Sequence, residues 1–415
     1  MLNFERKNLL CKLVQLSVFL FGALSLIAPS GYSYGPALLL CASFYFFIKK
    51  SVFIKLPTEM RLVGLALITY FIIMAMSVWI DGGKLSEIDR ASRALMIVIT
   101  LPLLVNVPVR LPILLSGYGV GAISAFLYAV HDKYILGFER AFNNNMPIQS
   151  GDIAISLGLF CLCGLLWAQK KAQPIFSIFM SFGAFCGIGA SFLSGSRGGW
   201  VLLPVVLYTI LMLFKVSITR KNIIFMMMAV LLGTFLVIQP QSGVAQRIES
   251  AQLDVTQYLD KTNLNTSLGI RFQLWQSAWA SFIDKPLFGW GNHGVRLSQA
   301  QQLQNGVISQ YIYDFNSHAH NQFLDDMAKR GVIGLIALLM ILLVPVVMVR
   351  KILKRPDNAD VHCGAALVIV TAFTSIDYCL SQAYFGHNSG ITFYLTSLVI
   401  GLSVVFGRKS EDTCN

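Results

Sequence analysis

Several arginines of this chain lie in settings suited to binding an anion. Arg197 lies within SGSRGGW, where glycines permit close approach of a ligand and serines offer hydroxyl groups. Arg271 precedes the aromatic stretch FQLW. A guanidinium group binds phosphate oxygens in a bidentate manner and keeps its charge at physiological pH. We therefore predict a phosphate-binding site that includes Arg93, Arg197, Arg271 and Arg296. The alternative for each arginine is contact with lipid headgroups.

The segment HAHNQF places His318, His320 and Asn321 directly before a long apolar run. An imidazole titrates near neutral pH, so a histidine here would serve as a general base. Asn321 is expected to cap the helix that follows. A metal site is the alternative, with Asp325 and Asp326 as further ligands. We favour the base without a metal or other cofactor, because adjacent aspartates point to different sides of a helix and the arginines already supply positive charge.

The composition places these residues in an integral membrane protein. Hydrophobic residues occupy 55% of the 415 positions and charged residues 13%, whereas about a quarter of a soluble domain is charged. A helix that crosses the hydrocarbon core needs about 20 apolar residues. Twelve stretches of this kind predict an all-α fold, with spans at residues 9–29, 35–54, 61–80, 91–108, 111–130, 151–168, 175–193, 199–215, 222–239, 331–349, 361–381 and 389–407.

Lys and Arg residues predict how these spans are oriented, because they are enriched in the short connections that face the cytoplasm. They concentrate in alternate connections, for example around residues 49–61 and 350–355. An even number of spans then places both termini in the cytoplasm. This pattern accounts for most of the net charge of +12, and nothing indicates a nucleic-acid partner.

One connection, residues 240–330, is far longer than the others and is expected on the outer side. It separates a first group of spans, residues 1–239, from a second group and tail, residues 331–415. Aromatic residues recur within it at steps of three and four, which predicts an amphipathic helix along the membrane surface. These residues are Phe272, Trp275, Trp279 and Phe282.

After this helix the connection is expected to lose regular structure. Asp284, Lys285 and Pro286 should end the helix, because a proline cannot continue it. Three glycines between residues 289 and 294 indicate turns. The polar residues 299–309 are expected to be mobile.

Two carboxylates, Asp152 and Asp377, fall inside predicted spans. Acidic residues within a membrane often carry ions or protons, so a coupled transporter is an alternative function. Two observations count against it: the candidate chemistry is concentrated in one outer connection, and the hydropathy shows no two-fold repeat.

Four motifs in this order resemble the O-antigen ligase and polymerase superfamily. They are SGSRGGW, IRFQLW, KPLFGWGNHG and SHAHNQFLDDMAKRGVIGL, and the resemblance covers roughly residues 145–350. The segment NNNMPIQSGDIAISLG, residues 143–158, looks more like the ligase branch than the polymerase branch.

The resemblance implies a GT-C-like glycosyltransferase of the bacterial inner membrane with a periplasmic active site. Its donor would be a glycan on undecaprenyl pyrophosphate, its acceptor a sugar of the lipid A-core oligosaccharide, and its surroundings membrane lipids. By motif, the family's arginines correspond to Arg197 and Arg271 and its histidine to His320. His318 has no such match and would be a neighbour of the base. Neither a metal nor a nucleotide sugar is implied. A polymerase that extends a second lipid-linked glycan, and a flippase, are the alternatives.

Overall fold

The structure is a computed structural model that describes residues 4–49, 55–196, 198–216, 244–315, 318–353 and 358–408. The regular elements within these ranges are all helical, as predicted. The bundle consists of α1 (Phe4–Leu24), α2 (Tyr34–Lys49), α3 (Thr58–Ile80), α4 (Asp89–Asn106), α5 (Leu111–Val130), α6 (Pro147–Lys170), α7 (Pro174–Leu193), α8 (Leu203–Leu213), α14 (Gln322–Leu353), α15 (Ala359–Ser381) and α16 (Asn388–Phe406).

Nine helices of the described residues are long and apolar enough to cross a membrane, so this is a multi-pass membrane protein. The twelve predicted spans are therefore confirmed in nine cases. α4 lies in the bundle against α3 and α16 but carries three charged residues near its start, Asp89, Arg90 and Arg93. α8 has only 11 residues, and the predicted span at 222–239 lies outside the described residues.

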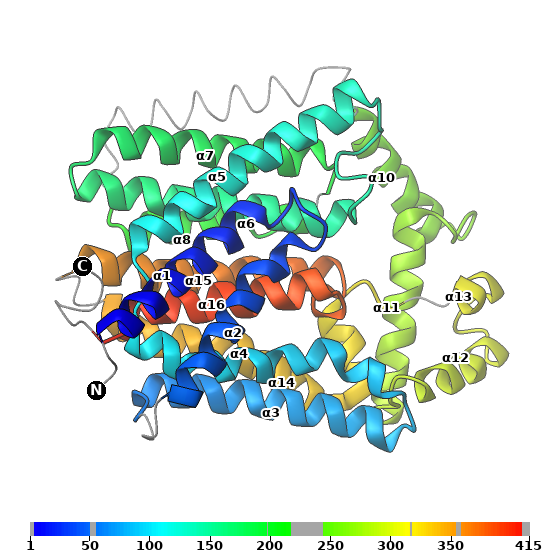
Figure 1. Ribbon diagram of the computed structural model, residues 1–415. Helices are drawn as coiled ribbons and strands as arrows, with labels where there is room; N and C mark the ends of the chain where they lie inside the picture. The colour runs from blue at the N-terminus through cyan, green and yellow to red at the C-terminus, as the bar shows by residue number, and fades with distance from the viewer. Residues whose placement is uncertain are drawn as a thin grey trace.

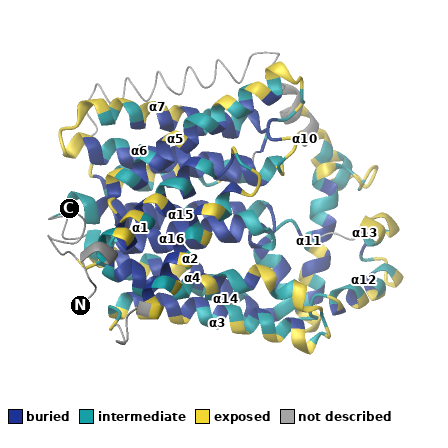
Figure 2. Cartoon of the chain, in the orientation of Figure 1, coloured by how far each residue is buried: buried dark blue, intermediate teal, exposed yellow. Residues whose placement is uncertain are grey.

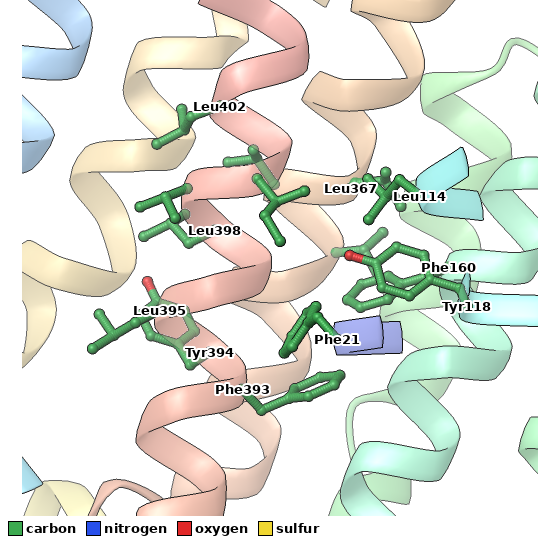
Figure 3. Packing of buried hydrophobic residues seen from close by; sticks show 14 of the residues in the cluster. Phe21, Leu114, Tyr118, Phe160, Leu367, Phe393, Tyr394, Leu395, Leu398 and Leu402 are labelled. Atoms are coloured by element: carbon green, nitrogen blue, oxygen red, sulfur yellow. The ribbon is translucent and has the colours of Figure 1, made fainter. Parts of the chain in front are cut away.

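The core of the bundle forms around α6, α15 and α16, whose side chains are buried on nearly all sides (Figure 2). Figure 3 shows aromatic rings from several helices meeting there. The ring of Phe393 lies 5.3 Å from that of Phe21 and 6.2 Å from that of Phe160. The outer faces instead expose large apolar side chains such as Ile72 and Phe185, which is the pattern expected where lipid chains replace water.

Four further helices follow α8 in the described chain: α10 (Val244–Leu259), α11 (Ser267–Asp284), α12 (Gly294–Gln304) and α13 (Gln310–Phe315). α10 and α11 cross one end of the bundle, transverse to its long helices (Figure 1). α1 begins and α16 ends at the opposite end.

α11 confirms the predicted amphipathic helix. The side chain of Thr266 caps its start by accepting from the N–H of Gly269 (3.1 Å), and the helix ends at Asp284 as expected. The face that packs on the protein carries Leu274 and Ala278. Of the aromatic stripe, Trp279 is 49% exposed. Phe272, Trp275 and Phe282 are partly buried, and the ring of Phe272 lies 5.0 Å from that of Tyr258 on α10. The contact of the stripe with a membrane surface stays a prediction.

The expectation of a mobile segment over residues 299–309 is wrong for its first part, which continues α12 to Gln304. The buried side-chain amide of Gln302 donates to the backbone oxygen of Ser277 (3.2 Å) and to the hydroxyl groups of Ser281 (2.9 Å) and Ser298 (3.0 Å). Hydrogen bonds to the polar face of α11 thus order the polar helix α12. Hydropathy does not reveal a contact of this kind.

The segment 286–291 joins α14 through direct backbone contact, which we call the glycine junction. α14 is broken at Gly331, whose φ of 62° and ψ of −155° belong to a region nearly exclusive to glycine. Across the break, Val332 donates to the oxygen of Pro286 and Gly291 to that of Lys329, both at 2.8 Å. A Cβ at Gly331 would overlap the backbone of Leu287. The junction therefore requires a residue without a side chain at position 331.

We expect Gly331→Ala to destabilise the protein by about 2–4 kcal/mol, because it adds a steric overlap to backbone strain. Gly306→Ala is the matched control, since Gly306 has a φ of 69° but open space around its Cβ position; it should lose only about 1 kcal/mol. Thermal unfolding midpoints in detergent would measure both. Equal losses in the two variants would contradict the role given to the junction.

Candidate functional site

Residues 318–321 form a turn directly before α14, in which side chains bond to the backbone. The N–H of His320 donates to Nδ1 of His318 (3.1 Å), and the N–H of Ala319 donates to the Asp325 carboxylate (3.2 Å). Oδ1 of Asn321 accepts from the N–H groups of residues 323 and 324, which confirms the predicted N-cap. Its Nδ2 donates to the backbone oxygen of Leu380 (3.2 Å). Both ends of the Asn321 amide are therefore engaged within the protein.

Three imidazoles meet at this turn. The ring centroid of His318 lies 4.4 Å from that of His320 and 6.1 Å from that of His387, which immediately precedes α16. His320 has a left-handed backbone with a φ of 47°. This conformation is uncommon outside glycine and occurs more often at functional sites.

Burial keeps all three histidines neutral at physiological pH. It lowers the pKa of His320 to about 4, helped by the neighbouring His318 and by the charge of Arg271, and opposed by Asp325. The pKa of His318 is also lowered, mainly by burial, and so is that of His387, with the charge of Arg90 as the next cause. A neutral imidazole carries one unprotonated ring nitrogen, so this cluster can accept a proton.

Two guanidinium groups flank the imidazoles. Arg271, on α11, is half-buried, which lowers its pKa, and its charge reaches His320. Arg90, at the start of α4, is close enough to lower the pKa of both His318 and His387. Over the described part of the chain, neither Arg90 nor Arg271 has a hydrogen-bond or ion-pair partner. Both are therefore available to an anionic ligand.

The other predicted arginines are engaged elsewhere or are not described. Arg93 pairs with Asp89 at 3.3 Å. Arg296 lies over the ring of Tyr313 at 4.1 Å and donates to the Tyr313 backbone oxygen at 2.9 Å. Arg197 lies outside the described residues.

The neighbours of Arg197 are nevertheless described. Gly198 and Gly199 begin the short helix η4 (Gly198–Trp200), and added Cβ atoms there would overlap Ser381 and Tyr378 of α15. These glycines therefore allow close packing against α15. The ligand approach expected from the sequence stays a prediction. Ser381 follows Leu380, whose carbonyl accepts from Asn321. The SGSRGGW segment and the histidine turn thus meet at the last turn of α15.

A charged cavity of about 320 Å³ lies between α3, α4, the start of α14 and residues 292–293. Its lining includes Arg90, Phe385 and Gly386 together with two ion pairs. These pairs are Lys329 with Asp325 and Arg330 with Asp326, each at 2.7 Å.

Both aspartates proposed as metal ligands are thus committed to basic partners four residues on. Throughout the described ranges, no group of three or more His, Cys, Asp or Glu side chains is arranged to hold a metal ion. The buried carboxylate of Asp152 likewise accepts from the side chain of Gln382.

Comparison with known proteins supports an assignment. Residues 182–339 match the family described as O-antigen ligase. A Haemophilus influenzae protein, described as uncharacterized, is 34% identical over 387 residues, which span 93% of this chain and 96% of that protein. The ComP-specific O-oligosaccharyltransferase of Acinetobacter baylyi is 24% identical over 274 residues, 63% of this chain and 46% of that protein.

The chain belongs to the O-antigen ligase family. It is accordingly a glycosyltransferase, acting on a lipid-linked glycan and an acceptor. The family match includes Arg271 and the histidine turn but neither Arg90 nor His387.

Sequence reasoning missed both of these residues as parts of the site. For Arg90 the available signal was its position at the start of a predicted apolar span, where an arginine is often functional. For His387 the signal was its position in GHNSG, directly before an apolar span.

His318 can be tested as a positioning residue in this family member. His318→Ala removes the acceptor for the His320 N–H and should slow transfer about tenfold, the effect of losing one hydrogen bond. His318→Asn should restore most activity, because an asparagine oxygen can accept from the N–H two residues on. Initial rates of both variants decide this. Loss of about 10²-fold or more in both would instead make His318 the base.

Proposed function

We propose that this glycosyltransferase transfers an O-antigen glycan from undecaprenyl pyrophosphate to a sugar of the lipid A-core oligosaccharide. The observation that supports it most directly is the cluster of three neutral imidazoles flanked by the unpaired guanidinium groups of Arg90 and Arg271. Such a cluster offers a proton acceptor beside a binding site for phosphate oxygens.

The acceptor hydroxyl would attack the anomeric carbon while the bond from that carbon to the pyrophosphate oxygen breaks. Direct displacement of this kind inverts the configuration at the carbon. Fixed cations stabilise the charge that develops on the leaving pyrophosphate. We assign this role to Arg271, Arg197 and Arg90. His320 would receive the hydroxyl proton, with His318 as a positioning residue. These steps call on no metal or nucleotide sugar.

The low pKa of His320 suggests that the donor itself activates the base. Burial and the charge of Arg271 disfavour the protonated imidazole. A bound pyrophosphate would place negative charge nearby, which favours that protonated form and raises the pKa. His320 would become a stronger base only once the donor is in place.

We further propose that the enzyme lies in a bacterial inner membrane with both termini in the cytoplasm and the site on the periplasmic side. The placement of α10 and α11 opposite the chain ends agrees with this (Figure 1). α4, α8 and residues 222–239 would complete twelve spans. The long periplasmic connection, residues 240–330, would rest on the membrane through the aromatic stripe of α11.

Two alternatives concern the acceptor. A polymerase would use a second lipid-linked glycan. The Acinetobacter baylyi relative is named for specificity toward ComP, so a protein acceptor is the other alternative. Transfer assays that offer each acceptor in turn separate the three.

We would purify the enzyme in detergent and supply a glycan on undecaprenyl pyrophosphate with lipid A-core, with and without a chelator. The expected product is glycosylated lipid A-core with inverted anomeric configuration. Glycan chains that grow only on the carrier would establish the polymerase, and modification of added protein only would establish a protein acceptor. Absence of every product would overturn the proposal of glycan transfer to lipid A-core.

The same assay tests the assigned residues. Arg271→Ala, Arg197→Ala and His320→Ala should each reduce the transfer rate by about 10²-fold or more, the usual effect of losing a stabilising donor or a base. Arg90→Ala should show a comparable loss, whereas Arg93→Ala, on the same helix but paired with Asp89, should stay near wild type. Equal activity of the Arg90 and Arg93 variants would remove Arg90 from the mechanism.

The pH dependence should differ between the free and donor-bound enzyme. A base must be deprotonated, so activity is lost as pH falls through its pKa. For kcat/KM of the donor, which reports the free enzyme, this loss should occur near the His320 pKa of about 4. For kcat it should occur at higher pH, because bound pyrophosphate raises that pKa. Coincident acidic limbs would contradict activation by the donor.

A further inference from the structure

A second cavity of about 230 Å³ lies at the same end of the bundle and has no role in the steps above. It lies between the loop after α1 and the starts of α6 and α16, and its lining carries amide and hydroxyl groups with no charged side chain. Its polar lining includes Asn145, Gln149, Ser150 and Ser389. We call it the amide cavity.

The polar wall of the amide cavity is held in place by a buried hydrogen-bond chain. Gln149 and Ser150 are 1% and 4% exposed. Oε1 of Gln149 accepts from the Ser389 hydroxyl (3.3 Å), and its Nε2 donates to Oε1 of Gln382 (3.0 Å). Gln382 in turn donates to Asp152. A buried hydrogen-bonded chain of this kind fixes which donor and acceptor atoms of Gln149 face a ligand.

One short segment separates the two cavities. Phe385 and Gly386 line the charged cavity, whereas Ser389 lines the amide cavity. His387, whose ring is 6.1 Å from that of His318, lies between them in the chain. His387 of the imidazole cluster thus lies one residue after the lining of the charged cavity and two residues before Ser389 of the amide cavity.

We infer that the amide cavity binds the acceptor sugar. This inference rests on the proposed function, in which direct displacement requires the acceptor hydroxyl and the leaving pyrophosphate on opposite sides of the anomeric carbon. The guanidinium group of Arg90 suits the pyrophosphate side. Fixed neutral amides and hydroxyls suit the hydroxyl groups of a sugar, which both donate and accept hydrogen bonds.

Three consecutive asparagines provide a matched test. Asn145 lines the amide cavity and its side chain has no hydrogen bond within the described chain, so Asn145→Trp should fill the cavity. Asn143 is exposed and does not line the cavity, so Asn143→Trp is the control. Asn145→Ala guards against misfolding of the larger variant, because it only removes one polar group.

Binding is measured first, by calorimetry with delipidated core oligosaccharide as the probe, so that the result does not depend on turnover. The dissociation constant should rise about tenfold in Asn145→Trp, as expected for the loss of one or two hydrogen bonds, and should be unchanged in Asn143→Trp. In the transfer assay, KM for the acceptor should rise while KM for the donor stays at the wild-type value.

A rise in donor KM alone would assign the amide cavity to the donor glycan and overturn the inference. Equal oligosaccharide binding by wild type and both Asn145 variants would also overturn it. Weakened oligosaccharide binding without transfer by wild type would uphold the acceptor site and reject the proposed reaction.

Discussion

The architecture of the site depends on two backbones that approach each other without side chains between them. At the glycine junction, residues 286–291 bond directly to the broken turn of α14, and this is the point where the long connection between α8 and α14 returns to the bundle. α11 ends just before the junction and the histidine turn precedes α14. The contact therefore sets the position of Arg271 relative to His320.

Charged side chains around the junction extend this constraint to α3 and α4. Arg330, next to Gly331, bonds to Asp326 and to Asn292. Asn292 donates to Glu87 (2.9 Å), and Asp81 accepts from the N–H of Gly294 (3.2 Å). The same turn that carries Glu87 leads into Arg90. Both guanidinium groups beside the histidines are thus positioned by one connected set of contacts.

Hydropathy and helix-end signals predicted the elements well, because they are local properties. The all-α fold, nine spans, the end of α11 at Asp284 and the Asn321 cap follow from apolar runs, proline and capping chemistry. α12 could not be predicted in this way, since Gln302 is ordered by serines of another helix. The proximity of Arg271 to His320 is likewise a tertiary property. Arg90 and His387, which are distant in sequence, also required the tertiary arrangement.

The transverse placement of α11 also determines at what depth the reaction would take place. With its aromatic stripe in the membrane surface, as proposed, Arg271 and the imidazoles lie level with phospholipid headgroups. The pyrophosphate of a polyprenyl carrier occupies that layer, so a donor would arrive by lateral diffusion in the bilayer. The enzyme would therefore meet its donor by diffusion within the plane of the membrane. A water-soluble glycan phosphate would lack this route.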